Sequence, residues 1–144
     1  MNSNLVNLIR TDKAWNERNW KDYADFFEDD LIAYRSGNST PHFKDVHLTI
    51  ANKFCHIFPD ALIHTDPYLV LFENAEINLT CSVARITGTM IGSMHLNYMI
   101  IEPNHRCFDV TLAVICRWRD GKIIEKREYF EGARMLSQLQ IRYQ

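Results

Sequence analysis

The C-terminal part of the chain carries charged side chains where a buried strand should be apolar. Residues 118–131 read as a strand, a turn at Asp120-Gly121, and a second strand that contains Lys126, Arg127 and Glu128. Both central residues of a type I′ turn have positive φ, which Asp tolerates and Gly prefers, so the turn predicts a hairpin. A carboxyl group that aromatic walls desolvate has a raised pKa, which suits it to proton transfer near neutral pH. The hairpin is therefore a candidate catalytic site.

The turn also predicts which residues share a face of the hairpin. With Asp120 and Gly121 as the turn, Trp118 faces Ile123 and Ala113 faces Glu128. One face then gathers six residues: Asp109, Thr111, Ala113, Lys126, Glu128 and Phe130. This face is a small polar cluster with an acid, Glu128, at its centre, and Asp109 on the same face could tune that acid or hold a water molecule.

Other arrangements of the hairpin are open. Lys126 could pair with Glu128 and hold it charged, or the charges could form the solvated face of an antiparallel sheet. The opposite face of the strand, with Phe108, Val110 and Leu112, is more apolar and could line the core, which would exclude Glu128. A β-bulge, common in bent sheets and next to active sites, would reverse this locally.

The rest of the pattern predicts the elements that must position these residues. Apolar residues at helical spacing predict helices over residues 5–16, 20–27 and 43–58, and a short helix over 132–139 closes the chain. Asn19 is the predicted cap of the second helix. Strands are predicted over residues 30–35, 61–72, 77–92, 106–118 and 122–130.

This order of elements predicts a single α+β domain over residues 1–144. Three helices in the N-terminal half would pack on a strongly curved, mixed but mostly antiparallel sheet, which makes a cone-shaped α+β barrel. An apolar cavity at its mouth would be a small-molecule site. Beyond the hairpin, the candidate substrate-binding residues are Tyr34, His64, Asp66, Met90 and Phe130.

Composition excludes several classes of function. A net charge of −2 without a basic run gives no reason to expect nucleic acid as a partner. No apolar run approaches the ~20 residues that span a bilayer, and the first residues do not resemble a signal peptide, so we expect a cytoplasmic protein. The histidines and the four cysteines lack metal-ligand spacing, which predicts reduced thiols and no metal.

Four motifs in this order resemble the SnoaL-like polyketide cyclases of the nuclear-transport-factor-2-like superfamily. Trp15-Asn16 with residues 20–23 resembles the two N-terminal helices, and Phe58-Pro59-Asp60-Ala61 resembles the junction between the third helix and the sheet. Residues 88–92, Gly-Thr-Met-Ile-Gly, and residues 120–125, Asp-Gly-Lys-Ile-Ile-Glu, are similar to the remaining two motifs. The resemblance covers nearly the whole chain.

The resemblance implies a cofactor-free cyclase or isomerase that acts on a hydrophobic polyketide-like or polycyclic molecule, in a homodimer. The family's general acid/base falls on Glu128. The sequence departs from the family where Lys126-Arg127-Glu128 replaces His-Trp-Asp and where Met90 replaces a frequent His. Dehydration or double-bond isomerisation is a neighbouring reaction on this fold. A non-catalytic binding or dimerisation module is the alternative function.

Overall fold

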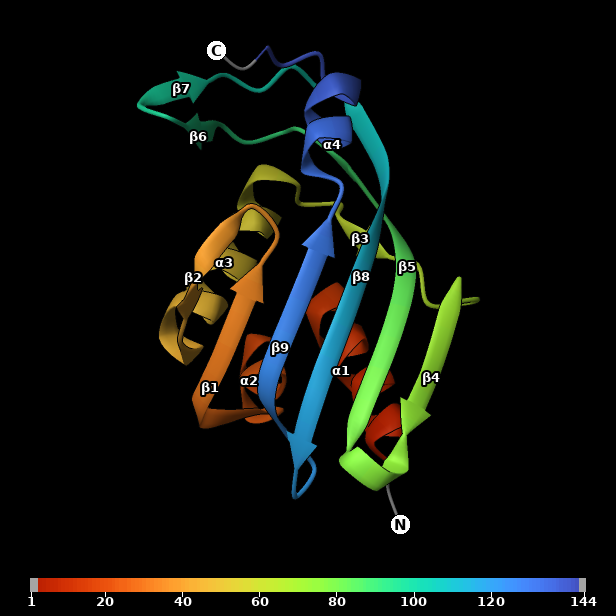
Figure 1. The fold of residues 1–144 in the computed structure, drawn as a ribbon. Coiled ribbons are helices and arrows are strands. Elements are labelled where there is room, and N and C mark those ends of the chain that lie inside the picture. The colour runs from red at the N-terminus through yellow and green to blue at the C-terminus, as the bar shows by residue number, and fades with distance from the viewer. Residues whose placement is uncertain (1–2, 143–144) are drawn as a thin grey trace.

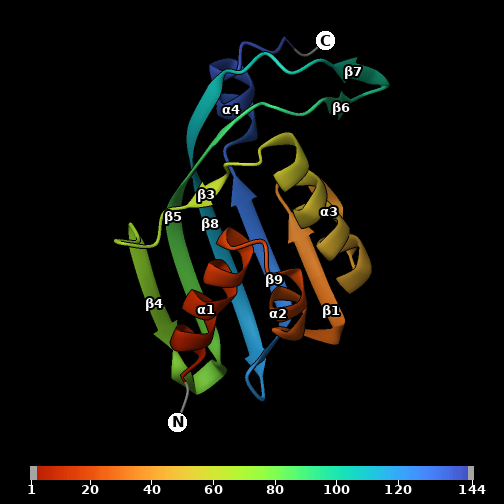
Figure 2. The ribbon, with the colours of Figure 1, turned by 180° about the vertical axis from the view of Figure 1, so that it is seen from behind.

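The helices cover one face of a mixed sheet and leave the other face open (Figures 1 and 2). A computed structural model describes residues 3–142. Over these residues the α-helices are α1 (Asn4–Asn16), α2 (Trp20–Asp25), α3 (Lys44–Ile57) and α4 (Gly132–Gln138). The first three lie in the N-terminal half and on the same side of the sheet, as predicted. Asn19 caps α2 by accepting a hydrogen bond from the backbone N–H of Asp22.

The last long strand of the chain lies inside the sheet. The sheet has the order β2 (Asn38–His42), β1 (Phe27–Arg35), β9 (Lys122–Phe130), β8 (Cys107–Arg119), β5 (Leu79–Thr89), β3 (Leu62–Ile63), and β4 (Val70–Asn74) also pairs with β5. The pair β1–β9 is parallel and the others are antiparallel. The fold is therefore α+β with a mixed, mostly antiparallel sheet, as the sequence predicted.

The structure differs from the predicted elements in four places. The predicted strand 61–72 is two strands, because residues 64–69 between β3 and β4 include Pro67, which has no N–H for a strand ladder. The residues after β1 form a further strand, β2. A separate hairpin of β6 (Met94–Leu96) and β7 (Met99–Ile101) projects beside α4 (Figure 1). A 3₁₀ turn, Ala75–Ile77, precedes β5.

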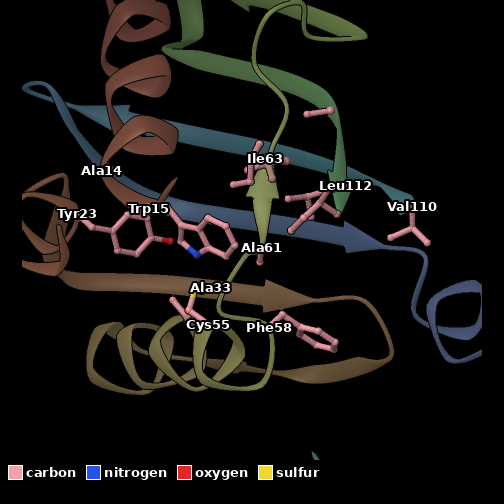
Figure 3. Close-up of a cluster of buried hydrophobic side chains, with 14 of the residues drawn as sticks. Ala14, Trp15, Tyr23, Ala33, Cys55, Phe58, Ala61, Ile63, Val110 and Leu112 are labelled. Atoms are coloured by element: carbon pink, nitrogen blue, oxygen red, sulfur yellow. The ribbon is translucent and has the colours of Figure 1, made fainter. Parts of the chain in front are cut away.

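The core lies between the helices and the inner face of the sheet, and it combines aliphatic side chains with several aromatic rings (Figure 3). Phe58 and Phe108 pack edge to face with their ring centroids 4.8 Å apart. His47, Ala51 and Cys55 form the buried side of α3, whereas Val46 is half exposed.

A bulge near the turn decides which side chains of β9 face the core. The turn is as predicted, with φ of 51° at Asp120 and 79° at Gly121. Trp118 faces Ile123, but beyond Ile124 the register shifts by one residue, so that Val114 faces Glu128 and Leu112 faces Phe130. The inner, buried face of β8 therefore aligns with Lys126, Glu128 and Phe130 of β9.

The segment after β5 is anchored to the end of α3 through Gly92. The backbone N–H groups of Ile91 and Gly92 both donate to the carbonyl oxygen of Ile57, at 3.0 and 2.9 Å. A Cβ atom on Gly92 would press against the carbonyl oxygen of His56 and lie 3.0 Å from the Cα of Ile57. Only glycine permits this close approach of two backbone segments.

We expect Gly92→Ala to lower the free energy of unfolding by about 1–3 kcal/mol, as other overpacked sites do. Urea denaturation of both proteins measures the difference. Gly132→Ala is the matched control, because its nearest neighbour is a Phe130 carbon 4.0 Å away. Equal losses in the two variants would contradict the proposed role of Gly92.

Candidate functional site

A pocket opens between the inner face of the sheet and helices α1, α2 and α3. Its empty space, including the mouth, is about 650 Å³. Most of the wall is apolar or aromatic, with a few polar groups. The lining residues from the helices are Asp12, Trp15, Tyr23, His47, Ile50, Ala51 and Phe54. The sheet contributes Arg35, Ile63, Ile86, Leu112, Val114, Lys126, Glu128 and Phe130.

Glu128 lies in this pocket between two cations. Its carboxylate is 3.4 Å from the Lys126 ammonium and 3.8 Å from the Arg35 guanidinium. Arg35 comes from β1, whose parallel pairing with β9 places Arg35 opposite Glu128. The Glu128 side chain is 22% exposed and the Lys126 side chain 10%. The sequence left open whether Lys126 pairs with Glu128. In the structure the two side chains do pair, and Glu128 also faces the pocket.

The Lys126 ammonium is buried beneath α2 and α3, and its hydrogens meet three acceptors. In addition to Glu128, the Tyr23 hydroxyl lies 3.2 Å away and Nε2 of His47 lies 3.3 Å away. The Phe27 ring, with its centroid 5.5 Å from Nζ, adds a cation–π contact. Burial acts to lower the pKa of Lys126, but Tyr23 and Glu128 raise it above its ordinary range. Lys126 is thus a fixed positive charge.

Two histidines continue the network away from the pocket. His47, in the first turn of α3, is buried, and its Nε2 lies 3.1 Å from the Tyr23 hydroxyl. Its Nδ1 lies 3.3 Å from Nε2 of His42, which is partly exposed at the end of β2. Burial and the Lys126 charge lower the pKa of His47 well below its usual value. Burial and Arg35 lower the pKa of His42. Both rings are therefore neutral at neutral pH.

A second carboxyl group, Asp12 of α1, lines the same pocket. The Tyr68 hydroxyl donates to it at 2.7 Å. Burial raises the pKa of Asp12 to about 6, although this hydrogen bond and the Lys126 charge act to lower it. The pocket thus contains a carboxylate held between cations and a second carboxyl group that changes charge just below neutral pH.

The structure brings together only part of the predicted site. Glu128 and Phe130 line the pocket. Asp109 was expected on the same face as Glu128, which is wrong, because the bulge moves Glu128 inward while Asp109 remains half exposed and pairs with Arg85 at 2.6 Å. Met90 is fully buried in the core and does not line the pocket.

Three other predicted binding residues also lie outside the pocket. Tyr34 follows the buried Ala33 on β1 and therefore points to the opposite face, where Arg127 stacks on its ring at 4.2 Å. His64 contacts Thr87 at 2.9 Å, and Asp66 is exposed in the loop between β3 and β4. These three residues do not line this pocket.

The pocket residues that the sequence did not predict come mainly from the helices. Asp12 is a polar residue within the apolar stripe of α1, three positions before Trp15, and His47 shares the buried stripe of α3 with Ala51. A polar residue at a buried helical position is the signal that could have indicated both. Tyr23 carries no such signal, since it reads as an ordinary core aromatic residue.

The described residues give no sign of a metal site or a membrane span. Across residues 3–142, no group of three or more His, Cys, Asp or Glu side chains is arranged to hold a metal ion. No helix in that range is long and apolar enough to cross a bilayer.

Comparison with known proteins places nearly the whole chain in one family. A family model of SnoaL-like polyketide cyclases matches residues 7–139. No curated protein matches the sequence. Similar solved structures include IdmH of Streptomyces antibioticus, a suggested polyketide cyclase, with a TM-score of 0.79, 19% identity, and coverage of 97% of this chain and 100% of IdmH.

Two further structures have the same fold. A suggested SnoaL-like polyketide cyclase from Jannaschia sp. CCS1 has a TM-score of 0.80 and 14% identity, with 97% of this chain and 93% of the other covered. AclR of Streptomyces galilaeus, a suggested hydroxylase, has a TM-score of 0.79 and 15% identity, with 95% and 80% covered. At these identities the likeness concerns the fold.

The raised pKa of Asp12 makes stability depend on pH. Because the unfolded chain loses this proton near the ordinary pKa of 3.8 and the folded protein near 6, stability falls as pH rises between these values. We expect Asp12→Asn, which stays neutral, to gain about 2 kcal/mol relative to the wild type between pH 4 and pH 8. Urea denaturation at both pH values measures this.

The matched control is Asp25→Asn, which removes one negative charge from an exposed position on α2. A gain of the same size in Asp25→Asn, or none in Asp12→Asn, would contradict the assignment of a raised pKa to Asp12.

Proposed function

The chain belongs to the SnoaL-like polyketide cyclase family, and on this premise we propose that it is a cofactor-free acid–base enzyme of the cyclase or isomerase type. Family membership supports the cyclase or isomerase type of function. The observation that supports the mechanism is the Glu128 carboxylate between Lys126 and Arg35 in a mostly apolar pocket that also contains Asp12. The proposed substrate is a hydrophobic, polyketide-like or polycyclic carbonyl compound.

Glu128 is the proposed base. Both of its ion pairs involve the carboxylate form, which is the form that accepts a proton. It would take a proton from the carbon next to a substrate carbonyl group, and the resulting negative charge would develop on the carbonyl oxygen. The adjacent Lys126 ammonium would stabilise this charge without reorganising, because its position is already fixed by Tyr23 and His47.

Asp12 is the proposed acid. Its pKa of about 6 is closer to neutral pH than that of an ordinary carboxyl group, which favours proton transfer under working conditions. It would donate its proton to the oxygen that becomes negative. In an isomerisation this oxygen belongs to the enol. In a cyclisation it belongs to the second carbonyl group, which the enolate carbon attacks to form the new carbon–carbon bond.

The apolar walls would supply orientation. Trp15, Phe54 and Leu112 line the pocket from opposite sides, and apart from the indole N–H of Trp15 they offer no hydrogen-bonding group. A flexible substrate held between such walls loses its freedom before reaction, which contributes to the rate of an intramolecular closure.

The test uses a simple carbon acid in place of the unidentified natural substrate. We expect the protein to accelerate the loss of deuterium from α-tetralone labelled beside its carbonyl group, measured in ordinary water by mass spectrometry. Glu128→Gln removes the base and should slow this exchange by about 10²–10⁴-fold, the usual contribution of a positioned base.

Glu125→Gln is the matched control, because Glu125 is on the same strand but pairs with Arg117 and Arg127 outside the pocket. Its exchange rate should equal that of the wild type. If the wild type exchanges the label no faster than Glu128→Gln does, the proposal is overturned and a non-catalytic binding module is favoured.

A further inference from the structure

Resting on the proposed function, we propose that Lys126, His47 and His42 form a proton relay that connects Glu128 in the pocket with solvent at the end of β2. The atoms lie in an unbroken series. From the Glu128 carboxylate to Lys126 Nζ is 3.4 Å, from Nζ to His47 Nε2 3.3 Å, and from His47 Nδ1 to His42 Nε2 3.3 Å. No gap in this series requires a bridging water molecule.

The chemistry of the groups fixes the direction of the hydrogen bonds. A lysine ammonium has only donors, so Nε2 of His47 must accept. A neutral imidazole that accepts at one nitrogen donates at the other, so Nδ1 of His47 donates to Nε2 of His42. From Lys126 to His42 the hydrogen bonds then point away from the pocket, whereas in the resting state Lys126 also donates to the Glu128 carboxylate.

The positions of the two rings support the same path. The His42 and His47 rings are nearly parallel, with an interplanar angle of 13° and centroids 5.5 Å apart. His47 is buried at 4% exposure, whereas His42 is partly exposed. The relay therefore has a buried middle and an end that water can reach.

Tyr23 and Arg35 flank the relay without extending it. Burial raises the pKa of Tyr23 to about 12, so its hydroxyl keeps its proton while it contacts both Lys126 and His47. The Arg35 charge contributes to the lowered pKa of His42, which favours release of a proton from His42 to water.

The transfer balances without a co-reactant. After Glu128 has taken a hydrogen from carbon, Lys126 passes one of its protons to Nε2 of His47, which leaves an amine with a free lone pair. That amine then takes the proton from Glu128. His47 releases its Nδ1 proton to Nε2 of His42, and His42 gives up its Nδ1 proton to water. Each group ends with its original charge. Each imidazole ends as the other tautomer, and rotation of the ring or the return of a proton restores the starting tautomer.

The relay has a role because a bound ligand closes the other exit. Glu128 faces the pocket, and a hydrophobic ligand there separates its carboxyl group from water at the mouth. Without a path through the protein, the abstracted proton would return to the carbon from which it came. The relay would release it from the side of Glu128 that lies against Lys126.

Exchange of the α-tetralone label measures this release directly, since a deuteron that returns to carbon is not lost. We expect His42→Ala to slow the exchange roughly tenfold, because water in place of the ring is a far weaker base. Free imidazole should restore the rate in His42→Ala and leave the wild-type rate unchanged. A merely structural role of His42 would not produce this recovery.

His47→Gln provides the second variant. The glutamine amide can still accept from Lys126 and donate towards His42, but an amide does not take up a proton near neutral pH. Exchange should therefore slow, and imidazole should not restore it, because position 47 is buried. His56→Ala is the matched control, since His56 is exposed near the other end of α3 and contacts the backbone oxygen of Asn52.

The outcomes separate the two proposals. Exchange lost in Glu128→Gln but unchanged in both His42→Ala and His47→Gln would overturn the relay and leave the proposed function standing. A slow His42→Ala variant that imidazole does not restore, although circular dichroism shows it to be folded, would also overturn the relay. Wild-type exchange equal to that of Glu128→Gln would overturn the proposed function itself.

Discussion

Burial of one positive charge, on Lys126, determines much of the arrangement around the pocket. A lysine ammonium removed from water requires an acceptor for each of its three hydrogens and an anion nearby. Tyr23 from α2, His47 from α3 and Glu128 from β9 supply them, so three elements are tied to one atom. Every buried side-chain nitrogen and oxygen in the described part of the chain has a hydrogen-bond partner. The same contacts of Lys126 therefore hold α2 and α3 to the sheet and make this part of the pocket polar.

The bulge at Ile124 is what makes this burial possible. A strand presents alternate residues to its two faces, so a shift of one residue exchanges the inner and the outer set. Before the shift Ile123 faces the core, and after it Lys126 and Glu128 do. The turn can therefore retain its Asp-Gly geometry while the far half of the strand carries polar groups inward. One inserted residue therefore allows a regular hairpin turn and a polar pocket to occur in the same strand pair.

The fold could be predicted from the sequence to a larger extent than the site. Helical spacing, the cap at Asn19 and the turn at Asp120-Gly121 are signals carried by residues close together in the sequence. Such signals are sufficient to predict individual helices and strands. Whether Asp109 or Arg35 accompanies Glu128 depends on strand register and on the pairing of β1 with β9, which involves residues more than 90 positions apart. The bulge was recognised as an alternative but could not be located, because Ile123 and Ile124 are equally suited to the core. His47 and Tyr23 were missed because their partner, Lys126, lies on a distant strand.

The position of β9 has a consequence for how the protein forms during synthesis. This strand is the last of the sheet to leave the ribosome, yet it lies between β1 and β8. Until it arrives, both neighbours present open edges that can pair with the wrong strand, and contacts between such distant segments form slowly. Lys126, Glu128 and Phe130 all arrive with this strand. The sheet and the pocket are therefore completed only when this strand arrives, and a nascent chain that lacks β9 has neither.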